Sequence, residues 1–175
     1  NLLKDESDFG GLKYVSLRYF NAAGADLDCE IGEDHDPETH LIPLVLQVPL
    51  KLRESINVFG TDYPTKDGTC IRDYIHVCDL ADAHIKAIHY LMNGNPSQII
   101  NLGNGEGYSV LEIIKAAEEV TQQSIQTKLC ERRAGDPAKL VACNTKAQEI
   151  LGWKPKYTNI KEIINTAWIF YTNQK

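Results

Sequence analysis

Hydrophobic and polar positions change period several times along the chain, and these changes mark out short strands and helices. Short runs of apolar and β-branched residues predict strands. They lie at Tyr14–Leu17, Ile56–Phe59, Tyr74–Val77, Gln98–Leu102 and Ile125–Leu129. Apolar residues spaced three and four apart predict helices. These lie at 1–9, 41–53, 79–92, 109–120, 147–151 and from 159 onward. Strands that alternate with helices predict an α/β layer structure.

Residues that favour helix ends sharpen these boundaries. Asp79 is expected to cap the helix that it opens. Ser109 is followed three residues later by Glu112, a capping box, and the last helix has the same kind of start. Pro49 lacks an amide donor, so it should kink or split the helix at 41–53.

Composition places the chain among ordinary globular proteins. It has 175 residues, 43% of them hydrophobic and 24% charged, which predicts one to one and a half domains. Its 18 basic and 24 acidic residues give a formal charge of −6, without any block of Lys or Arg. Nucleic acid and anionic membranes are therefore not expected as partners. No apolar run is long enough to span a membrane.

The five cysteines are an odd number and contain no Cys-x-x-Cys pair. This pattern predicts free, mostly buried thiols in a reducing cytosol, and hence a cytoplasmic protein. The chain begins at Asn1 rather than Met, and its first nine residues are typical of the end of a helix. We therefore expect its start to be a cut.

The stretch from Asn101 to Gly107 follows a predicted strand and opens a helix, as a dinucleotide-binding glycine loop does. Its glycines depart from the G-x-G-x-x-G spacing, and Tyr108 stands where a small residue should let helix and strand approach. Two interpretations remain, cofactor binding and a tight strand-to-helix turn, and the spacing favours the turn.

Tyr157 and Lys161 have the Tyr-x-x-x-Lys spacing that lowers the pKa of a catalytic tyrosine in short-chain dehydrogenases. Tyr157 precedes the predicted helix cap, so the two side chains would not share a helix face. We therefore assign no catalytic residue in this chain.

Residues with metal-ligating side chains gather just before the helix at 41–53. They are Asp34, His35, Asp36, Glu38 and His40. Their irregular spacing, with Pro37 between them, favours a solvated loop over a metal site. No metal is predicted.

Two segments carry the charge that would hold a phosphate. Arg72 lies in GTDYPTKDGTCIRDYIHV (60–77), between a turn-rich loop and a short apolar strand. Arg132 and Arg133 precede a glycine turn and Asp136. The planar fork of arginine suits pyrophosphate oxygens, and a carboxylate can accept hydrogen bonds from a ribose diol. Together the segments predict a site for a nucleotide diphosphate.

Several long motifs resemble those of the UDP-glucose 4-epimerases, of the extended short-chain dehydrogenase/reductase group. They are LRYFNAAGAD, THLIP, INVFGTDYPTKDGTCIRDYIHVCDLADAH, NLGNGEGYSV, RRAGDPAKLVA and LGWKPKY. They run from about residue 13 to the end, in the order and spacing of that family. The resemblance implies the same fold class, a substrate-binding α/β domain plus the last strands and helices of a Rossmann-type NAD(P)-binding fold.

The resemblance also implies roles for the charged residues. Arg72 and Arg133 would clamp the pyrophosphate of a UDP-sugar, Asn21 would touch the same diphosphate, and Asp136 would hold the uridine ribose. The charge pattern alone selects the same two arginines and the same aspartate.

Further roles follow from the resemblance alone. Two residues would lie near the nicotinamide of bound NAD: Tyr19 and Phe20. Three consecutive residues would frame the uracil: Asn57, Val58 and Phe59. His40 and Leu41 would meet the substrate through backbone groups. Leu140 would lie beside the sugar. A leucine there leaves both plain and N-acetylated hexoses open, and its volume favours the plain hexose.

The reaction implied is the interconversion of UDP-glucose and UDP-galactose. Bound NAD takes a hydride from carbon 4 of the sugar, the 4-keto intermediate rotates, and the hydride returns to the other face. This chemistry needs a glycine-rich NAD loop and a Ser and Tyr-x-x-x-Lys set, none of which we find in place. We therefore expect the chain to anchor the UDP-sugar and to be inactive alone.

The expected domains are 1–38, a remnant of the NAD-binding Rossmann domain, and 39–175, a UDP-sugar-binding α/β domain whose part 74–102 packs back on the Rossmann sheet. Two alternatives remain open. The chain could be a non-catalytic nucleotide-sugar-binding module, or one half of a split epimerase. The strand at 14–17 should leave an exposed edge, so we also expect a homo-oligomer or other self-association.

Overall fold

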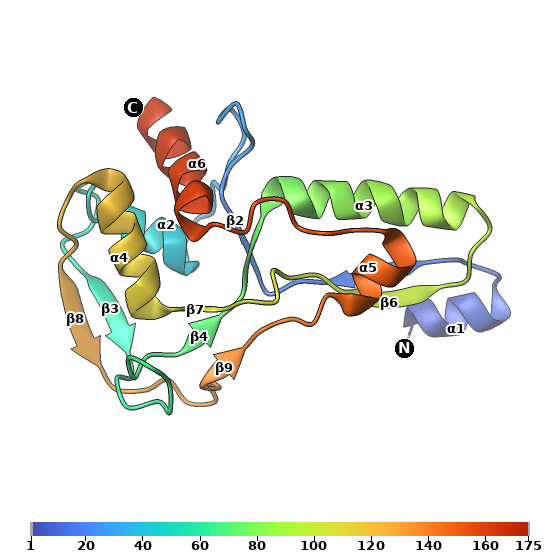
Figure 1. The fold of residues 1–175 in the computed structure, drawn as a ribbon, viewed down its shortest axis with the longest axis horizontal. Coiled ribbons are helices and arrows are strands. Elements are labelled where there is room, and N and C mark those ends of the chain that lie inside the picture. Colours follow the sequence, from blue (N-terminus) through green and yellow to red (C-terminus); the bar gives the residue numbers. More distant parts are fainter. Residues whose placement is uncertain (1, 175) are drawn as a thin grey trace.

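The computed structural model describes residues 2–174, and its helices lie mostly where the periodicity predicts them (Figure 1). The helices are α1 (Leu2–Phe9), α2 (Leu41–Leu46), α3 (Val77–Met92), α4 (Val110–Thr121), α5 (Thr145–Leu151) and α6 (Ile160–Asn173). The capping box of Ser109 and Glu112 is present at the start of α4. Gly152 ends α5 in the left-handed conformation that glycine adopts easily.

The strands form four small sheets. Strand β1 (Val15–Arg18) pairs in parallel with β6 (Gln98–Asn101), β2 (Asn21–Ala23) with β5 (Tyr74–His76), and β3 (Ile56–Phe59) with β8 (Thr127–Cys130). In the fourth sheet β4 (Ile71–Arg72) lies between β7 (Tyr108–Ser109), which is antiparallel, and β9 (Lys139–Leu140), which is parallel. This mixture of helices and mainly parallel pairs confirms the α/β class.

The two larger hydrophobic cores lie among elements toward opposite ends of the elongated molecule, which Figure 1 shows. The larger core joins α2, α4 and α6 to β3, and it includes Val45, Val58, Ile113 and Ile163. The smaller core lies between α3, α5 and the β1–β6 pair. Its largest member, Trp153, is fully buried, and its indole Nε1 donates to the main-chain oxygen of Asp79 at 2.9 Å.

The helix expected at 41–53 is shorter than predicted, because α2 ends at Leu46. Pro49 cannot donate to the carbonyl four residues before it, and Lys51 adopts a positive φ of 61°. The amides of Leu52 and Arg53 then donate back to the oxygen of Gln47. Pro49 therefore stops the helix rather than kinking it.

The expected cap of α3 is wrong. The N-cap is His76, whose ring Nδ1 accepts from the amide of Cys78 at 3.1 Å. Asp79 lies within the first turn and is buried, and its carboxylate accepts from the amides of Lys156 and Tyr157 at 2.9 and 3.0 Å. Asp79 thus joins α3 to the segment between α5 and α6, a contact that local sequence does not reveal.

Other differences are small. The strand expected at 125–129 lies at Thr127–Cys130, and β2, β4, β7 and β9 are too short to show a period in the sequence.

All five cysteines are free, but only Cys29 and Cys70 are buried, so the expectation of mostly buried thiols is wrong. Among residues 2–174, no helix combines the length and the apolar character needed to cross a membrane.

Candidate functional site

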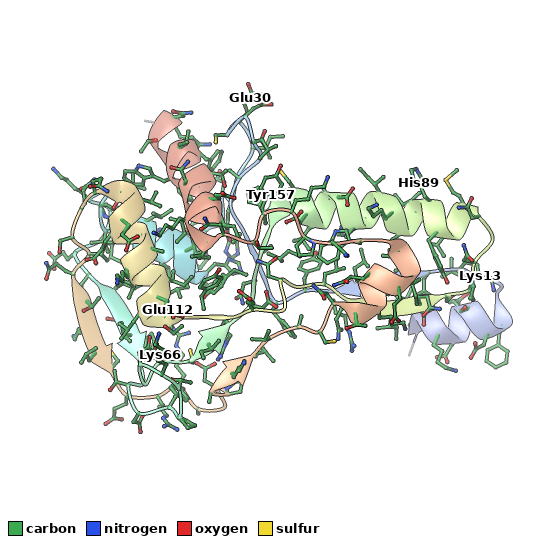
Figure 2. All side chains as sticks on the ribbon, in the orientation of Figure 1. Lys13, Glu30, Lys66, His89, Glu112 and Tyr157 are labelled. Carbon is green, nitrogen blue, oxygen red and sulfur yellow. The ribbon has the colours of Figure 1, made fainter. Side chains whose placement is uncertain are left out.

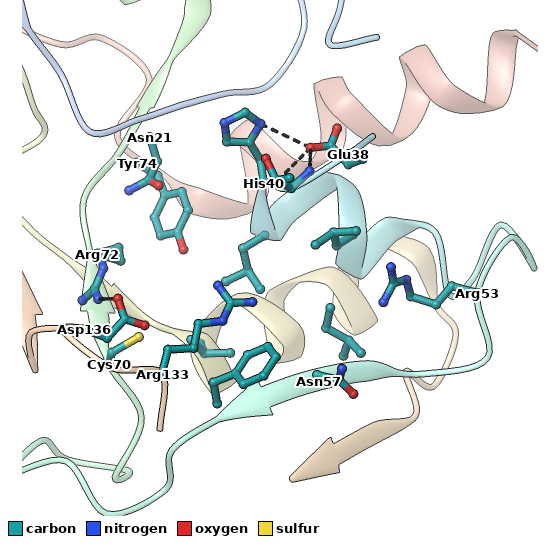
Figure 3. Close-up of a pocket in the computed structure, with 16 residues that line it drawn as sticks. Asn21, Glu38, His40, Arg53, Asn57, Cys70, Arg72, Tyr74, Arg133 and Asp136 are labelled. Atoms are coloured by element: carbon teal, nitrogen blue, oxygen red, sulfur yellow. Dashed lines mark hydrogen bonds and ion pairs between the residues drawn. The ribbon is translucent and has the colours of Figure 1, made fainter. Parts of the chain in front are cut away.

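A cavity of about 430 Å³ opens between α2, β3, β4 and the loop that precedes β9 (Figure 3). Arg72 and Asp136 lie on one side of it, Arg53 on the other, and His40 with Glu38 at the start of α2. The cavity wall therefore combines several cations with an apolar floor that includes Leu44, Ile56 and Val110.

Arg72 is held in the wall by three contacts. Its Nη2 donates to Oδ1 of Asp136 at 3.0 Å, and its Nη1 donates to the main-chain oxygens of Ile71 and Pro137 at 2.8 and 2.9 Å. The side chain of Arg72 is 14% exposed and that of Asp136 33%. Because this ion pair borders water, a ligand can replace one of its partners at modest cost.

Arg133 lies over the ring of Phe59, with its Cζ 3.9 Å from the ring centre. This cation–π contact places the guanidinium beside the cavity, which both residues line. The neighbouring Arg132 instead stacks on Tyr63 and pairs with Asp62 at 2.6 Å, and it is not among the lining residues. Of the two consecutive arginines, Arg133 is the one that faces the cavity.

Asp73, next to Arg72, serves the fold rather than the cavity. Its carboxylate accepts from the amides of Asn104, Gly105 and Ala142 at 3.0, 3.3 and 3.1 Å. Burial raises the pKa of Asp73, and the three amide hydrogen bonds oppose this rise. The glycine-rich loop therefore uses its amides on an internal carboxylate, which supports its interpretation as a strand-to-helix turn.

Gly103 is required in this loop by close packing. A Cβ there would meet the carboxylate of Asp73 well inside van der Waals contact and would lie 2.5 Å from the Cβ of Ala142. Because Gly103 has no side chain, its backbone can lie close to Asp73.

Most of the predicted substrate residues meet at this one cavity. The lining includes Asn21, His40, Leu41, Asn57, Phe59, Arg72, Arg133 and Asp136. Val58 is fully buried in the core and is not among the lining residues. Leu140 pairs with Arg72 across β4 and β9 and is also outside the lining.

Tyr19 and Phe20, predicted to contact a cofactor, line a separate cavity of about 370 Å³. Both rings are 43% exposed. His40 lines this cavity and the larger one, so the two spaces adjoin at its side chain.

Several lining residues were not predicted from sequence. Arg53 lies where the predicted helix runs out, and no phosphate-binding motif surrounds it. Tyr74 and Cys70 flank Arg72 and also line the cavity, and burial raises the pKa of both groups. The alternation of side chains along 70–74 is the signal that could have identified them, since Cys70, Arg72 and Tyr74 share one face.

The Tyr157–Lys161 pair does not form a catalytic unit. The ring of Tyr157 packs against His76 at 4.7 Å between centres, whereas Lys161 forms an ion pair with Glu119 of α4. Tyr157 lies in the segment between α5 and α6 (Figure 2). The Tyr-x-x-x-Lys spacing in the sequence therefore does not place the two side chains together in the fold.

Comparison with known proteins places the chain in a family. Residues 2–103 match the NAD dependent epimerase/dehydratase family. The chain belongs to that family. This membership confirms the resemblance at the level of the family, and it agrees with the parallel strand pairs described above.

Curated proteins that are similar to the chain include a UDP-glucose 4-epimerase of Lacticaseibacillus casei. It is 56% identical over 163 residues, which are 93% of this chain and 49% of that protein. A crystal structure of a UDP-glucose 4-epimerase superposes with a TM-score of 0.96 at 55% identity, covering 99% of this chain and 53% of that one. The UDP-glucose 4-epimerase of Bifidobacterium longum, in complex with NAD+ and UDP, superposes with a TM-score of 0.89 at 37% identity, covering 97% and 50%.

The chain thus spans about half the length of the curated relatives it matches. The alignments extend beyond the matched 2–103, so the epimerase likeness includes the loop that carries Arg133 and Asp136.

Proposed function

We propose that this chain is the UDP-sugar-anchoring part of a UDP-glucose 4-epimerase that uses NAD. The observation that carries the proposal is the meeting of Arg72, Arg133 and Asp136 at one cavity, from segments about sixty residues apart. The similarity to UDP-glucose 4-epimerases along nearly the whole chain supports it.

The two arginines hold the pyrophosphate of the UDP-sugar, and Asp136 accepts hydrogen bonds from the ribose. In the structure, Arg72 pairs with Asp136 and Arg133 stacks on Phe59. Binding exchanges these contacts for charge-assisted hydrogen bonds to phosphate, while the side chains of Asn57 and Phe59 frame the uracil. Val58, whose side chain is buried, takes part through its main chain alone. Asn21, His40 and Leu41 complete the wall beside the diphosphate, and Leu140 lies next to the sugar.

Tyr19 and Phe20, which are partly exposed beside the second cavity, would offer an apolar surface to the nicotinamide of NAD. NAD supplies the acceptor and donor of a hydride. In this assignment residues 1–38 belong to the NAD-binding Rossmann domain, and residues 39–175 form the UDP-sugar domain, whose part 74–102 packs back on the Rossmann sheet.

Titration calorimetry of the chain with UDP tests the anchoring role. We expect binding that weakens with added salt, and about a 10- to 100-fold loss of affinity in Arg133→Ala, because a hydrogen bond to a charged group is worth about 1.5 to 3 kcal/mol. Arg132→Ala is the matched control and should change the affinity by less than about twofold, since an exposed ion pair contributes little. Equal losses in both variants, or no UDP binding at all, would contradict the proposal.

An activity assay separates the alternatives. We expect no interconversion of UDP-glucose and UDP-galactose by this chain alone, because it has no glycine-rich NAD loop of the required spacing and Tyr157 and Lys161 lie apart. Activity that appears on mixing with the amino-terminal half of an epimerase would favour a split enzyme. UDP binding without any gain on mixing would favour a non-catalytic binding module.

Self-association is part of the proposal. Large apolar side chains are exposed on α1 and α3, including Phe9, Ile85, Ile88 and Met92, and each strand of the β1–β6 pair has one partner among the described residues. Light scattering should report a dimer or larger species that Ile88→Lys weakens. If the unsubstituted chain is a monomer, the self-association proposal is wrong, while the proposal that the chain anchors a UDP-sugar is unaffected.

A further inference from the structure

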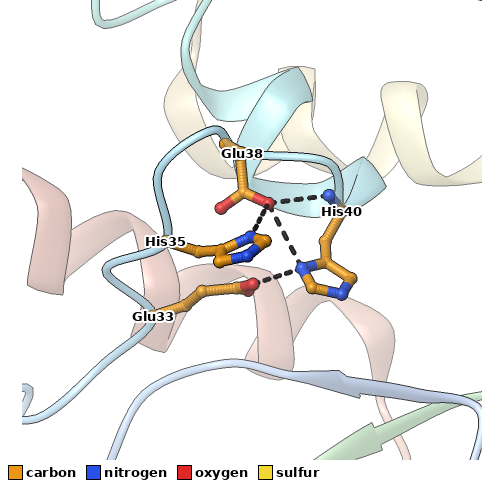
Figure 4. A group of neighbouring side chains, drawn as sticks. All are labelled: Glu33, His35, Glu38 and His40. Carbon is orange, nitrogen blue, oxygen red and sulfur yellow. Dashed lines mark hydrogen bonds and ion pairs between the residues drawn. The ribbon is translucent and has the colours of Figure 1, made fainter.

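The loop before α2 brings four metal-ligating side chains to one point (Figure 4). They are Glu33, His35, Glu38 and His40. One ligand atom from each lies within 4.8 Å of the other three. The sequence indicated a solvated loop and included Asp34 and Asp36, which are exposed and outside this group, while it overlooked Glu33.

The spacing fits a small tetrahedral ion. Oε1 of Glu38 lies 3.8 Å from Nδ1 of His35 and 3.2 Å from Nδ1 of His40, and Oε1 of Glu33 pairs with the same nitrogen of His40. Ligands about 2.1 Å from a zinc ion would be about 3.4 Å from one another. Small side-chain rotations therefore suffice to bring the four atoms onto such an ion.

The donor types indicate which ions would bind. Two imidazoles favour zinc and its transition-metal neighbours over calcium or magnesium, which prefer oxygen ligands. The two carboxylates would balance a charge of +2. Burial raises the pKa of Glu33, and the charge of Glu38 raises it further, so a cation between these carboxylates would relieve their repulsion.

Other groups hold the carboxylate of Glu38 and the main chain of Glu33. Oε1 of Glu38 accepts from the amides of Thr39 and His40 at 2.6 and 2.7 Å. The hydroxyl of Tyr171 in α6 donates to the main-chain oxygen of Glu33 at 2.9 Å. The Glu38 side chain is 9% exposed, whereas both imidazoles are 50% exposed. The cluster thus has a fixed, buried carboxylate and an open histidine side through which an ion can enter.

We propose that Glu33, His35, Glu38 and His40 form a binding site for a divalent transition-metal ion of the zinc class. The ion joins the loop to His40, the N-cap of α2. Because Glu38 and His40 also line the large cavity, the bound ion fixes one part of its wall. The site stands on its own geometry and does not depend on the proposed epimerase role.

The test is a titration of the whole chain with Zn²⁺ alone and with Co²⁺ alone, in buffer freed of metal by a chelator. We expect one ion per chain and the intense visible absorption of tetrahedral Co²⁺. His35→Gln and Glu33→Gln should each lower the affinity by at least about tenfold, because even outer contacts of metal sites are worth that much. Neither side chain belongs to the lining of the large cavity.

Asp34→Asn is the matched control, since it removes the same charge from the same loop outside the cluster. Its affinity should stay within about twofold of the original chain. Equal effects of Glu33→Gln and Asp34→Asn, or a weak Co²⁺ spectrum of octahedral type, would overturn the proposal. If Glu33→Gln fails to fold, as seen by circular dichroism, the half-exposed His35 decides the matter through His35→Gln.

Discussion

The segment from Arg72 to Asp79 supplies charges to two different regions of the molecule. In the cavity wall, Arg72 pairs with another side chain, Asp136, at the border of solvent. In the buried junction between β5, α3 and the loops that cover them, Asp73 and Asp79 accept hydrogen bonds only from main-chain amides. A ligand can compete for the first kind of contact, while the second kind connects distant parts of the backbone. Arg72 and Asp73 are adjacent and both charged, yet Arg72 lines the cavity and Asp73 connects parts of the backbone.

Removal of Asp73 should have the largest effect. Asp73→Ala leaves the amides of Asn104, Gly105 and Ala142 without their acceptor, and each unsatisfied buried amide costs about 1 to 3 kcal/mol. We expect the free energy of unfolding to fall by about 3 kcal/mol or more, measured by urea denaturation.

Asp82→Ala in α3 is the matched control, because Asp82 is only partly buried and its side chain forms no hydrogen bond or ion pair within residues 2–174. It should change the free energy of unfolding by less than about 0.5 kcal/mol. Asp73→Asn should lie between the two, because one amide oxygen can keep at most two of the three hydrogen bonds. An Asp73→Ala chain as stable as Asp82→Ala would remove the distinction between the two regions.

Substitutions in the glycine-rich loop at 101–107 should affect the stability of the same junction less than the loss of Asp73 does. Gly103→Ala should lower the free energy of unfolding by about 2 kcal/mol, because its Cβ would press on Asp73 and Ala142. Gly105→Ala is the comparison, since Gly105 has a positive φ of 78° and an added Cβ would meet only Nδ2 of Asn144, at 4.0 Å. Backbone strain there should cost only about 1 kcal/mol. Thermal or urea unfolding of both variants checks this order, and the reverse order would show that packing against Asp73 is unimportant.

Features that depend on nearby residues could be predicted from the sequence, whereas contacts between distant segments could not. The strand at 56–59 and the capping box of Ser109 were predicted correctly, because both depend on neighbours a few residues away. The role of Asp79 was missed, since its partners lie more than seventy residues further along the chain. In the site, charge type alone indicated Arg72 and Arg133. Arg53 required the tertiary structure, because only folding brings the segment after α2 to the cavity.

Arg72 should affect binding more than stability. Arg72→Met removes its hydrogen bonds to phosphate, and we expect UDP affinity to fall by about 10- to 100-fold. The free energy of unfolding should change by less than about 1 kcal/mol, because the partner Asp136 is 33% exposed and regains water. Calorimetry with UDP and urea denaturation on the same sample measure both quantities. A large loss of stability with unchanged affinity would place Arg72 in the junction rather than in the cavity wall.

The pH dependence of stability should report on His76, within the junction. Burial lowers its pKa below the usual 6.5, while Asp79 and Glu162 oppose the shift. The ring is neutral in the fold, because Nδ1 accepts from Cys78 and Nε2 lies 3.2 Å from the hydroxyl of Thr166. The unfolded chain takes up a proton at a higher pH than the folded one, so stability is lost as the pH falls from about 6.5 toward the lowered value.

The measurement is the urea midpoint at about pH 7.5 and about pH 5.5, where we expect a lower midpoint in acid. His76→Gln keeps a polar side chain but cannot titrate, so it should remove part of this drop while being less stable at neutral pH. The difference between the two chains isolates His76 from Glu33, whose raised pKa gives the opposite sign, with stability lost as the pH rises. If the drop is the same in both chains, the acid sensitivity comes from elsewhere and the junction does not respond to protons through His76.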